Sequence, residues 1–410
     1  MLREWVHELL VSLMHLERRT EPFWRPFTDA KFREPTAALL QLLINVQRRH
    51  QGMELAEERL LPGEEQALDS IIADMGAYMR RKYRPGEFER VGNTKTHGLV
   101  RAEVSIREDL PLELRQGIFR EARSFPAWVR FSGPGPDSPP DIDDVGFMSM
   151  TIKLMGVPGP KLLEDEKETQ DLLAICTPTF VTPTVVANAQ LQQQLLLRTP
   201  LYYFWNLRRP HLLDFFMQSL WNETQTSPLE CQYYSTVPYL LGQGRAMQYS
   251  FRPRSQTRSK IPDLPGRPPD NYLRDNMAVT LSQRDVVFDL LIQVQTDPHA
   301  MPIEDAAVRW PEKLSPFIPA ATIRIPRQRF DSPAQLRFAS TLVYTPWHCI
   351  PEHRPLGNQN RARRRLYWEL SQLRLTKNRT PHYEPSGRET FDDEPVANDT
   401  LKSPAAYRAS

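Results

Sequence analysis

The segment RVGNTKTHG at residues 90–98 places His97 in a polar run directly before the strand-like stretch LVRAEVSI. A neutral imidazole can accept a proton and return it near physiological pH, so His97 is a candidate general base. A histidine in such a place can also serve the fold through hydrogen bonds of its ring, and we favour that structural role. The sequence leaves both interpretations open.

Other familiar chemistry has little support. Cys176, Cys231 and Cys349 are far apart and show no CxxC or Cys/His spacing, which argues against a zinc site and a disulfide framework and favours a reducing cytoplasm. The sequence contains no GxGxxG, P-loop, HExxH or GxSxG motif and no recognisable acid/base pair of carboxylates. Nucleotide-binding and serine-hydrolase functions are therefore not indicated.

The composition is that of a globular protein. Of 410 residues, 25% are charged and 40% hydrophobic, and the net charge of +2 gives no whole-chain argument for binding nucleic acid. We expect no spanning helix and no signal peptide. Leu2, Val6, Leu9, Leu13 and Leu16 share one face of a predicted helix over 1–19. This face could make a weak membrane-surface contact, but packing on the chain's own domain or on a partner subunit is favoured.

The periodicity predicts helices over 1–19, 36–51 and 63–83, then short alternating strands from Thr96 onward, with helical regions at about 187–223 and 359–375. No regular alternation of strands and helices occurs, so an α+β protein with a largely antiparallel sheet or barrel is predicted. In FDLLIQVQT, the face with Leu291, Gln293 and Gln295 is polar enough to line a cavity or meet another layer. We divide the chain into an N-terminal helical segment (1–84), a core (85–376) and a flexible tail (377–410).

Residues 290–335 resemble the haem catalases and their divergent catalase-like (catalase-related peroxidase) relatives. The ordered matches are Ile292–Val294, Val308–Pro311, Pro316–Pro319 and Ser332–Pro333. Further matches are FPAWVRFSG at 125–133, VGFMSMTIKLMGVPG, QDLLAICTPTFV and YTPWHCIPEHRPLG. The resemblance covers roughly 85–360. It implies a catalase-like antiparallel β-barrel with an N-terminal helical layer and C-terminal helices, and haem b held between the barrel and the helix of Tyr344.

The resemblance also implies roles for individual residues. Tyr344 falls on the axial iron ligand, with His348 as the alternative ligand, and Ser132 falls near the distal face. The family arginine that keeps the axial tyrosine ionised is replaced by Ser340, and Arg337 is a candidate substitute. The arginines implied to contact haem propionates are Arg90, Arg130 and Arg354.

Two distal positions depart from the family pattern. Asn93 stands where the family has its distal histidine, and an amide can orient a peroxide but cannot shuttle its proton. Ile175 and Cys176 stand where the family has asparagine. Cys176 could ligate or be oxidised, but packing as a small apolar group is favoured. His97 could take over the missing base.

The implied function is haem-dependent oxidoreduction of hydrogen peroxide or of organic or lipid hydroperoxides, including hydroperoxide rearrangement. The alternatives are a catalytically degenerate haem-binding protein or sensor, and a scaffold that no longer binds haem. We expect a small-molecule peroxide as partner, a homo-oligomer as a possible assembly, no nucleic acid, and a cytoplasmic location. We expect no flavodoxin-like domain of the kind that the large catalases carry, and no nicotinamide site can be transferred.

Overall fold

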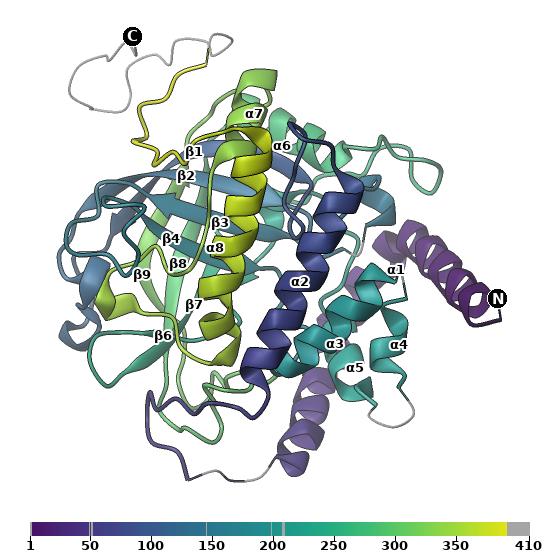
Figure 1. Ribbon diagram of the computed structural model, residues 1–410, viewed down its shortest axis with the longest axis horizontal. Coiled ribbons are helices and arrows are strands. Elements are labelled where there is room, and N and C mark those ends of the chain that lie inside the picture. The colour runs from purple at the N-terminus through teal and green to yellow at the C-terminus, as the bar shows by residue number, and fades with distance from the viewer. Residues whose placement is uncertain are drawn as a thin grey trace.

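The computed structural model describes residues 2–48, 50, 52–144, 146–197, 199–206 and 210–391. Its centre is an antiparallel β-barrel (Figure 1). The described strands are β1 (Thr96–Ile106), β2 (Ser124–Ser132), β3 (Ser149–Leu154), β4 (Gln170–Ile175), β5 (Tyr233–Tyr234), β6 (Tyr239–Leu240), β7 (Ala246–Pro253), β8 (Val286–Val294) and β9 (Ile318–Ile325). The predicted α+β class and antiparallel barrel are thus confirmed.

The sheet order is β5-β4-β3-β2-β1-β9-β8-β7-β6, and a pairing of β5 with β7 closes the ring, which leaves the short β6 beside β7. The strands at the two ends of the sequence meet in this ring, since β1 pairs with β9 with Val104 opposite Ile323. The antiparallel pairing throughout agrees with the turn residues and prolines between the strands.

Strand alternation separates two environments. On β2, Phe125, Ala127, Val129 and Phe131 belong to the large apolar core of the barrel, whereas Trp128, Arg130 and Ser132 alternate with them and face outward. These outward residues are also buried, because helices and loops cover this side of the barrel. The polar face predicted for β8 meets another layer: Gln293 donates to the main-chain oxygens of Trp310 and Ser315.

The helices surround the barrel. The α-helices are α1 (Leu2–Gln47), α2 (Glu64–Lys82), α3 (Val185–Leu196), α4 (Leu201–Phe204), α5 (Leu212–Ser219), α6 (Tyr272–Gln283), α7 (Pro333–Thr341) and α8 (Asn358–Asn378). Short 3-10 helices are η1 (Leu112–Leu114), η2 (Gly117–Phe119), η3 (Asp141–Asp143), η4 (Pro228–Glu230) and η5 (Pro351–His353). None of the helices in the described ranges is both long and apolar enough to span a membrane.

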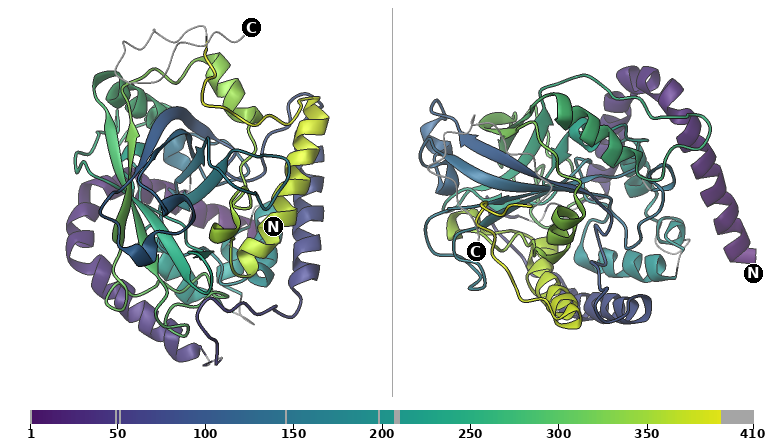
Figure 2. Two further views of the ribbon diagram at one scale, coloured as in Figure 1. Left: turned by 90° about the vertical axis from the view of Figure 1, so that its left-hand side faces the viewer. Right: turned by 90° about the horizontal axis from the view of Figure 1, so that it is seen from above.

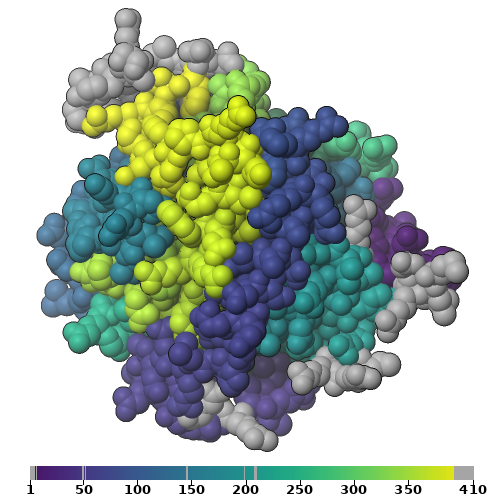
Figure 3. Space-filling model, viewed as in Figure 1, coloured from purple at the N-terminus to yellow at the C-terminus, as the bar shows by residue number. Residues whose placement is uncertain are grey.

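One helical layer lies on the outside of the barrel. α2 and α8 run side by side across one face of the molecule, and α3 packs against both (Figures 1 and 3). Their apolar contacts come from Leu68 and Ile71 of α2, Val185 and Ala189 of α3, and Leu366 of α8. This layer holds α8 in place beside the segment that follows α7.

α1 is one continuous helix where the sequence predicted two, at 1–19 and 36–51. The helix continues although Pro22, Pro26 and Pro35 lie in the intervening stretch, where each proline removes a helical hydrogen bond. Polar contacts hold this stretch: Arg25 donates to the main-chain oxygens of Ser219 and Asn222 at the end of α5. Tertiary contacts therefore outweigh the local preference of the prolines.

The C-terminal segment starts differently from the prediction. α8 extends to Asn378, past the expected start of the tail at 377, and the described residues up to 391 lie against the barrel. Arg101 donates to the main-chain oxygen of Gly387 at 3.0 Å, and the Trp128 indole donates to Glu389 at 2.9 Å. Residues 392–410 of the predicted flexible tail lie outside the described residues.

Candidate functional site

The strand register gathers the outward side chains of β2, β3 and β4 on one side of the barrel. Ser132 pairs with Ser149, and Ser149 pairs with Ile175, so these three positions form one row across the strands. Alternation along the same strands turns Arg130 and Lys153 outward. The segment after α7, which carries Tyr344, covers this outer face.

Three arginines converge where α7 ends. Arg90 donates to the main-chain oxygens of Ala339, at 3.1 Å, and of Leu342. Arg374 of α8 donates to the main-chain oxygens of Ser340 and Leu342. The negative end of a helix favours such cations, so the C-terminus of α7 explains part of this arrangement.

Arg130 binds on the other side of the group. Its guanidinium donates to the main-chain oxygen of Asn93 at 2.6 Å and to Thr96 Oγ1 at 2.7 Å. Arg130 therefore ties the loop before β1 to the outer face of β2.

These guanidinium groups lack acidic partners. Within the described ranges, Arg90, Arg130 and Arg374 form no ion pair with a carboxylate, and Arg130 and Arg374 are fully buried. Burial, followed by the positive charge of Arg90, lowers the pKa of Arg130 to about 9. Burial and the other two arginines lower the pKa of Arg374 as well. Buried charge of one sign without a counter-ion is unfavourable, so the group is suited to an anion.

Tyr344 lies next to these cations, three residues after the end of α7. Its ring is partly accessible, but its hydroxyl is buried and has no hydrogen-bond partner within the described ranges. The Lys153 ammonium lies 5.4 Å from the ring centroid and the Arg90 guanidinium 5.9 Å. Burial raises the pKa of Tyr344 to about 12, and Lys153, Arg130 and Arg90 oppose that rise. The phenol stays neutral unless a cation binds its oxygen.

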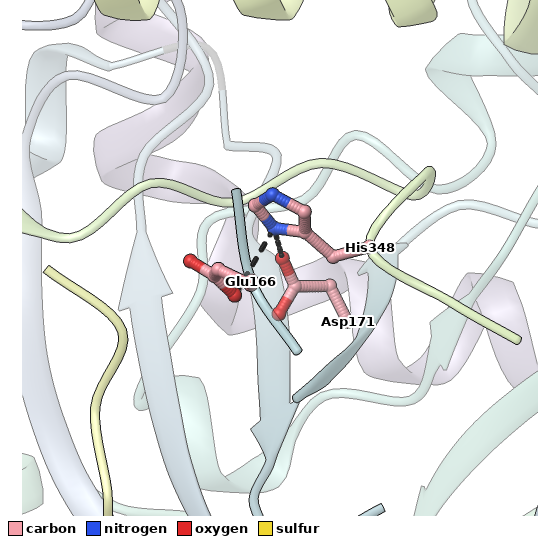
Figure 4. A group of neighbouring side chains, drawn as sticks. All are labelled: Glu166, Asp171 and His348. Carbon is pink, nitrogen blue, oxygen red and sulfur yellow. Dashed lines mark hydrogen bonds and ion pairs between the residues drawn. The ribbon is translucent and has the colours of Figure 1, made fainter. Parts of the chain in front are cut away.

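A buried ionic network lies next to Tyr344, with Lys153 at the Tyr344 ring. Figure 4 shows three other members of the network, Glu166, Asp171 and His348. The Lys153 ammonium is 2.5 Å from a Glu166 carboxylate oxygen and 2.8 Å from one of Asp171. His348 Nδ1 is 3.1 Å from Asp171 and 3.2 Å from Glu166, and its Nε2 is 3.0 Å from Asp165. Burial alone would lower the pKa of His348, but hydrogen bonds to Asp165 and Asp171 outweigh it and raise the pKa to about 9.

This network positions the segment of Tyr344. Asp171 accepts a hydrogen bond from the main-chain nitrogen of Thr345 at 3.0 Å, and its own nitrogen donates to the main-chain oxygen of His348. Glu166, Asp171 and His348 place donor atoms within 4.8 Å of one another, as a metal site would. The Lys153 ammonium lies between the two carboxylates, so the network already contains its cation. His348 uses both ring nitrogens here and has none left for iron.

His97 lies at an irregularity of the β1–β2 pairing, between Thr96 and Gly98. The side chain is buried, and neither ring nitrogen has a hydrogen-bond partner in the described part of the chain, although Nδ1 is 3.7 Å from Asp141. The hydrogen-bonded structural role expected for it is not found there. Burial, with Lys95 and Arg274 nearby, holds the pKa of His97 well below its usual range. The imidazole is therefore neutral.

The other distal positions divide into two groups. Asn93 is partly buried in the left-handed backbone region, with φ of 53°, and Ser132 is buried with its hydroxyl unpartnered in the described ranges. Asn93 accepts a hydrogen bond from Arg130 through its main-chain oxygen, and Ser132 lies two residues from Arg130 on the same face of β2. Cys176, by contrast, belongs to the barrel core, accepts a hydrogen bond from the Met148 nitrogen, and has its pKa raised to about 12 by burial. Its thiol is packed, as favoured from the sequence.

Two predicted arginines lie apart from this group. Arg337 is exposed, and the cations that act on Tyr344 are Lys153, Arg130 and Arg90. Arg354 forms an ion pair with Glu58 at 2.6 Å. Sequence reasoning missed Lys153 and Arg374. A lysine between apolar residues of a strand was a usable signal for the first, whereas Arg374 is one of several basic residues of α8 and carries no such signal.

Comparisons with solved structures identify the fold. The chain is similar to a fungal catalase, with 17% identity, a TM-score of 0.58, and coverage of 89% of this chain and 75% of that one. It is also similar to a bacterial catalase (14%, TM-score 0.53, 87% and 71%) and to catalase A of Saccharomyces cerevisiae (16%, TM-score 0.56, 88% and 77%). No protein-family model and no curated protein matches the sequence.

Proposed function

We propose, from the catalase fold that the chain adopts, that it is a haem-dependent oxidoreductase acting on a peroxide. The substrates that fit are organic or lipid hydroperoxides as well as hydrogen peroxide, and hydroperoxide rearrangement belongs to the same proposal. Fold alone does not assign chemistry, so the proposal depends on the residues between β2 and the end of α7.

The observation that carries the proposal is the Tyr344 hydroxyl, buried and unpartnered in the described ranges, beside guanidinium groups without carboxylates. A phenolate oxygen is a hard donor suited to ferric iron, and guanidinium groups pair with carboxylates. The donor set therefore fits haem b, a cofactor with an iron and two propionates. Haem would supply a redox-active, Lewis-acidic iron.

In this proposal, Tyr344 holds the iron, and Arg90, Arg130 and Arg374 hold the propionates. Arg374 takes the place that the resemblance gave to Arg354, because Arg354 is paired with Glu58. Lys153 and its neighbouring cations favour the ionised phenol, as Arg337 was expected to do. Asp171 keeps the Tyr344 segment in position through the Thr345 nitrogen.

On the distal side, the chain offers an amide, an imidazole and a hydroxyl. Asn93 makes no side-chain hydrogen bond within the described ranges, so its amide is available to orient a bound peroxide. His97 is neutral and is the group nearby that can accept a proton. Because the amide cannot relay a proton, we propose that substrates whose oxygen stays in the product react better than hydrogen peroxide.

The second candidate is a catalytically degenerate haem-binding protein or sensor. The observations favouring it are the amide at position 93 and the packing of Cys176 in the core, which together leave the distal side without its two family groups. Product analysis with hydrogen peroxide and with fatty-acid hydroperoxides separates the two candidates. We also propose a cytoplasmic location, with which the three free, buried thiols agree.

The test of the proposal is haem binding by the Tyr344→Phe variant. We expect the wild-type chain to bind haem with the spectrum of oxygen-ligated, high-spin ferric iron, and Tyr344→Phe to lose haem or change that spectrum. Tyr203→Phe is the matched control, since it removes a buried hydroxyl that is also unpartnered in the described ranges but lies in α4. Wild-type chain without a Soret band, or an unchanged spectrum in Tyr344→Phe, would contradict the proposal.

A further inference from the structure

α1 is attached in two ways: its C-terminal part packs on Met217, Trp221 and Val308 through Ala37, Leu40 and Ile44, whereas residues 18–25 contact the rest of the molecule through polar side chains. Arg18 donates to Asn222, Glu21 accepts hydrogen bonds from the nitrogen and the hydroxyl of Thr224, and Arg25 donates to the end of α5. The N-terminal half of the helix runs out beyond the barrel (Figure 2). An isolated surface helix normally buries its apolar side, so the N-terminal half of α1, which is attached by its polar side, leaves an apolar face to explain.

The outward face of α1 carries apolar side chains in alternating steps of three and four residues. We call this row the seam; it consists of Leu9, Leu13, Leu16, Thr20, Phe23 and Phe27. Steps of four and three place successive residues at the a and d positions of a heptad, the pattern by which one helix packs along another. Leu2 and Val6 continue the spacing, although their side chains lie outside the described ones.

The seam is exposed along its whole described length. Leu13 is 53% exposed, Leu16 62% and Phe27 76%, and Trp5 and Trp24 flank the row and are exposed too. An aromatic side chain can bury about 150–250 Å², and roughly half of that surface is exposed in Trp5, Phe23, Trp24 and Phe27. These four side chains alone therefore offer on the order of 400 Å² to a partner. That is about half of the ~800 Å² that each partner contributes to a standard interface, before the leucines are counted.

We propose that the seam is a homodimer interface, in which α1 of one copy packs against α1 of a second copy. The heptad spacing calls for a helix with the same spacing, and among the described helices α1 is the one that carries such an exposed row. In a twofold dimer the same surface serves both partners, so the contact closes. This inference does not depend on the proposed function.

The charges of α1 favour a second copy over a lipid surface. Helices that lie on membranes carry an excess of basic residues on their polar side. α1 has as many acidic as basic residues, so two copies meet without net repulsion and anionic lipid gains no net attraction. The basic residues are Arg3, Arg18, Arg19, Arg25, Lys31 and Arg33, and the acidic ones are Glu4, Glu8, Glu17, Glu21, Asp29 and Glu34.

The experiment is sedimentation velocity of the purified full chain over a range of concentrations. We expect a concentration-dependent dimer for the wild type and a monomer for the double variant Leu13→Lys with Leu16→Lys. Each lysine enters the interface twice, so the dissociation constant should rise by at least about 100-fold.

The matched control is Leu39→Lys with Leu42→Lys. It makes the same chemical change on the same helix at similar exposure, 57% and 58%, but outside the seam. All four positions are exposed, so both variants should fold, which circular dichroism checks. The proposal stands if the control dimerises like the wild type. It is overturned if the wild type is monomeric, or if both variants behave alike.

Lipid binding is measured in the same preparations by co-sedimentation with vesicles of phosphatidylcholine and phosphatidylglycerol. We expect no more binding by the wild type than by the seam variant. If the wild type is monomeric and binds vesicles, and the seam variant does not bind them, the seam contacts a membrane surface and not a second copy. Haem content should be equal in all variants, which separates this result from the outcome for Tyr344.

Discussion

At position 93 the side chain offers an amide, and four residues later His97 offers a neutral imidazole without a hydrogen bond in the described ranges. The two differ in what they can do for a peroxide. The amide donates and accepts hydrogen bonds but keeps its protons, whereas the imidazole can take one. Gly133 lies close to His97: an added Cβ there would be 3.6 Å from His97 Nε2, an ordinary contact, but 2.6 Å from Asp144 Oδ2. The absence of a side chain at position 133 therefore leaves room for the Asp144 carboxylate.

Restoring the base at position 93 should accelerate the reaction with hydrogen peroxide. A positioned general base contributes about 10²–10⁴-fold, so haem-loaded Asn93→His should evolve oxygen faster than the wild type by a factor in that range. Histidine is among the residues that tolerate the left-handed backbone of Asn93, with φ of 53°. If the wild type is already fast and His97→Ala is inactive, His97 is the base and the assignment to position 93 is wrong.

A second prediction concerns Arg374, to which we assign the propionate contact, and Arg354, for which the resemblance implied it. A charge-assisted hydrogen bond to a carboxylate contributes about 1.5–3 kcal/mol, so Arg374→Ala should weaken haem binding by roughly 10- to 100-fold. Arg354→Ala should leave haem affinity nearly unchanged, because its partner is Glu58. Titration of haem into the apoprotein measures both. If Arg354→Ala weakens haem binding more than Arg374→Ala does, then Arg354 binds the propionate and Arg374 does not.

Among the elements, α1 shows how tertiary contacts override local preference. A proline in a helix interior costs about 3 kcal/mol, yet α1 continues through Pro22 and Pro26, in a stretch that the predicted helices did not cover. Arg25 lies between these prolines and makes ion pairs with Glu21 and Asp29 in addition to its contacts at the end of α5. One guanidinium thus joins two turns of α1 to α5.

We expect Arg25→Ala to destabilise the attachment of α1 by about 2–4 kcal/mol, because it leaves partly buried carboxylates and carbonyl oxygens without their donor. The free energy of unfolding in urea and the rate of limited proteolysis within α1 measure the effect. Lys31→Ala, an exposed change on the same helix, serves as the control and should shift stability by less than about 0.5 kcal/mol. Equal behaviour of the two variants would show that Arg25 does not anchor the helix.

Other differences between expectation and structure also have local causes. The residues of β4, QDLLAI, are largely buried on both faces and show no regular alternation of polar and apolar residues, the pattern that identifies a strand from sequence. The outer face that Arg130 and Ser132 share, on the other hand, follows from the alternation of residues along β2. Arg374 could not be foreseen, since nothing in a basic helix tells which arginine turns inward.

For the whole molecule, one buried neutral histidine, His353, limits the stability of the folded state in acid. His353 in η5 joins two distant parts of the chain: its Nε2 accepts from the Ile118 nitrogen at 3.0 Å, and its Nδ1 lies 3.2 Å from the main-chain oxygen of Leu240. Burial lowers the pKa of His353 to about 4, despite the opposing hydrogen bond to Leu240. The folded protein therefore resists protonation at this site.

The free energy of unfolding should therefore fall as the pH falls. The unfolded chain binds a proton at His353 near pH 6.5 and the folded chain near pH 4, so this stability is present above pH 6.5 and is lost as the pH falls toward 4. The loss should reach roughly 3 kcal/mol. His353→Gln, whose amide can replace both contacts, should flatten that part of the profile. Urea unfolding between pH 4 and 7.5 measures it, and identical slopes would refute the assignment.

The pairing of β1 with β9 has a consequence for how the protein is made. Val104 and its partner Ile323 are 219 positions apart, and β9 leaves the ribosome long after β1. At 5–20 residues per second the interval is roughly 10–40 s. During translation β1 therefore presents an unpaired strand edge, the kind of surface that seeds aggregation. Synthesis of this chain should depend on chaperones that cover that edge until the ring can close.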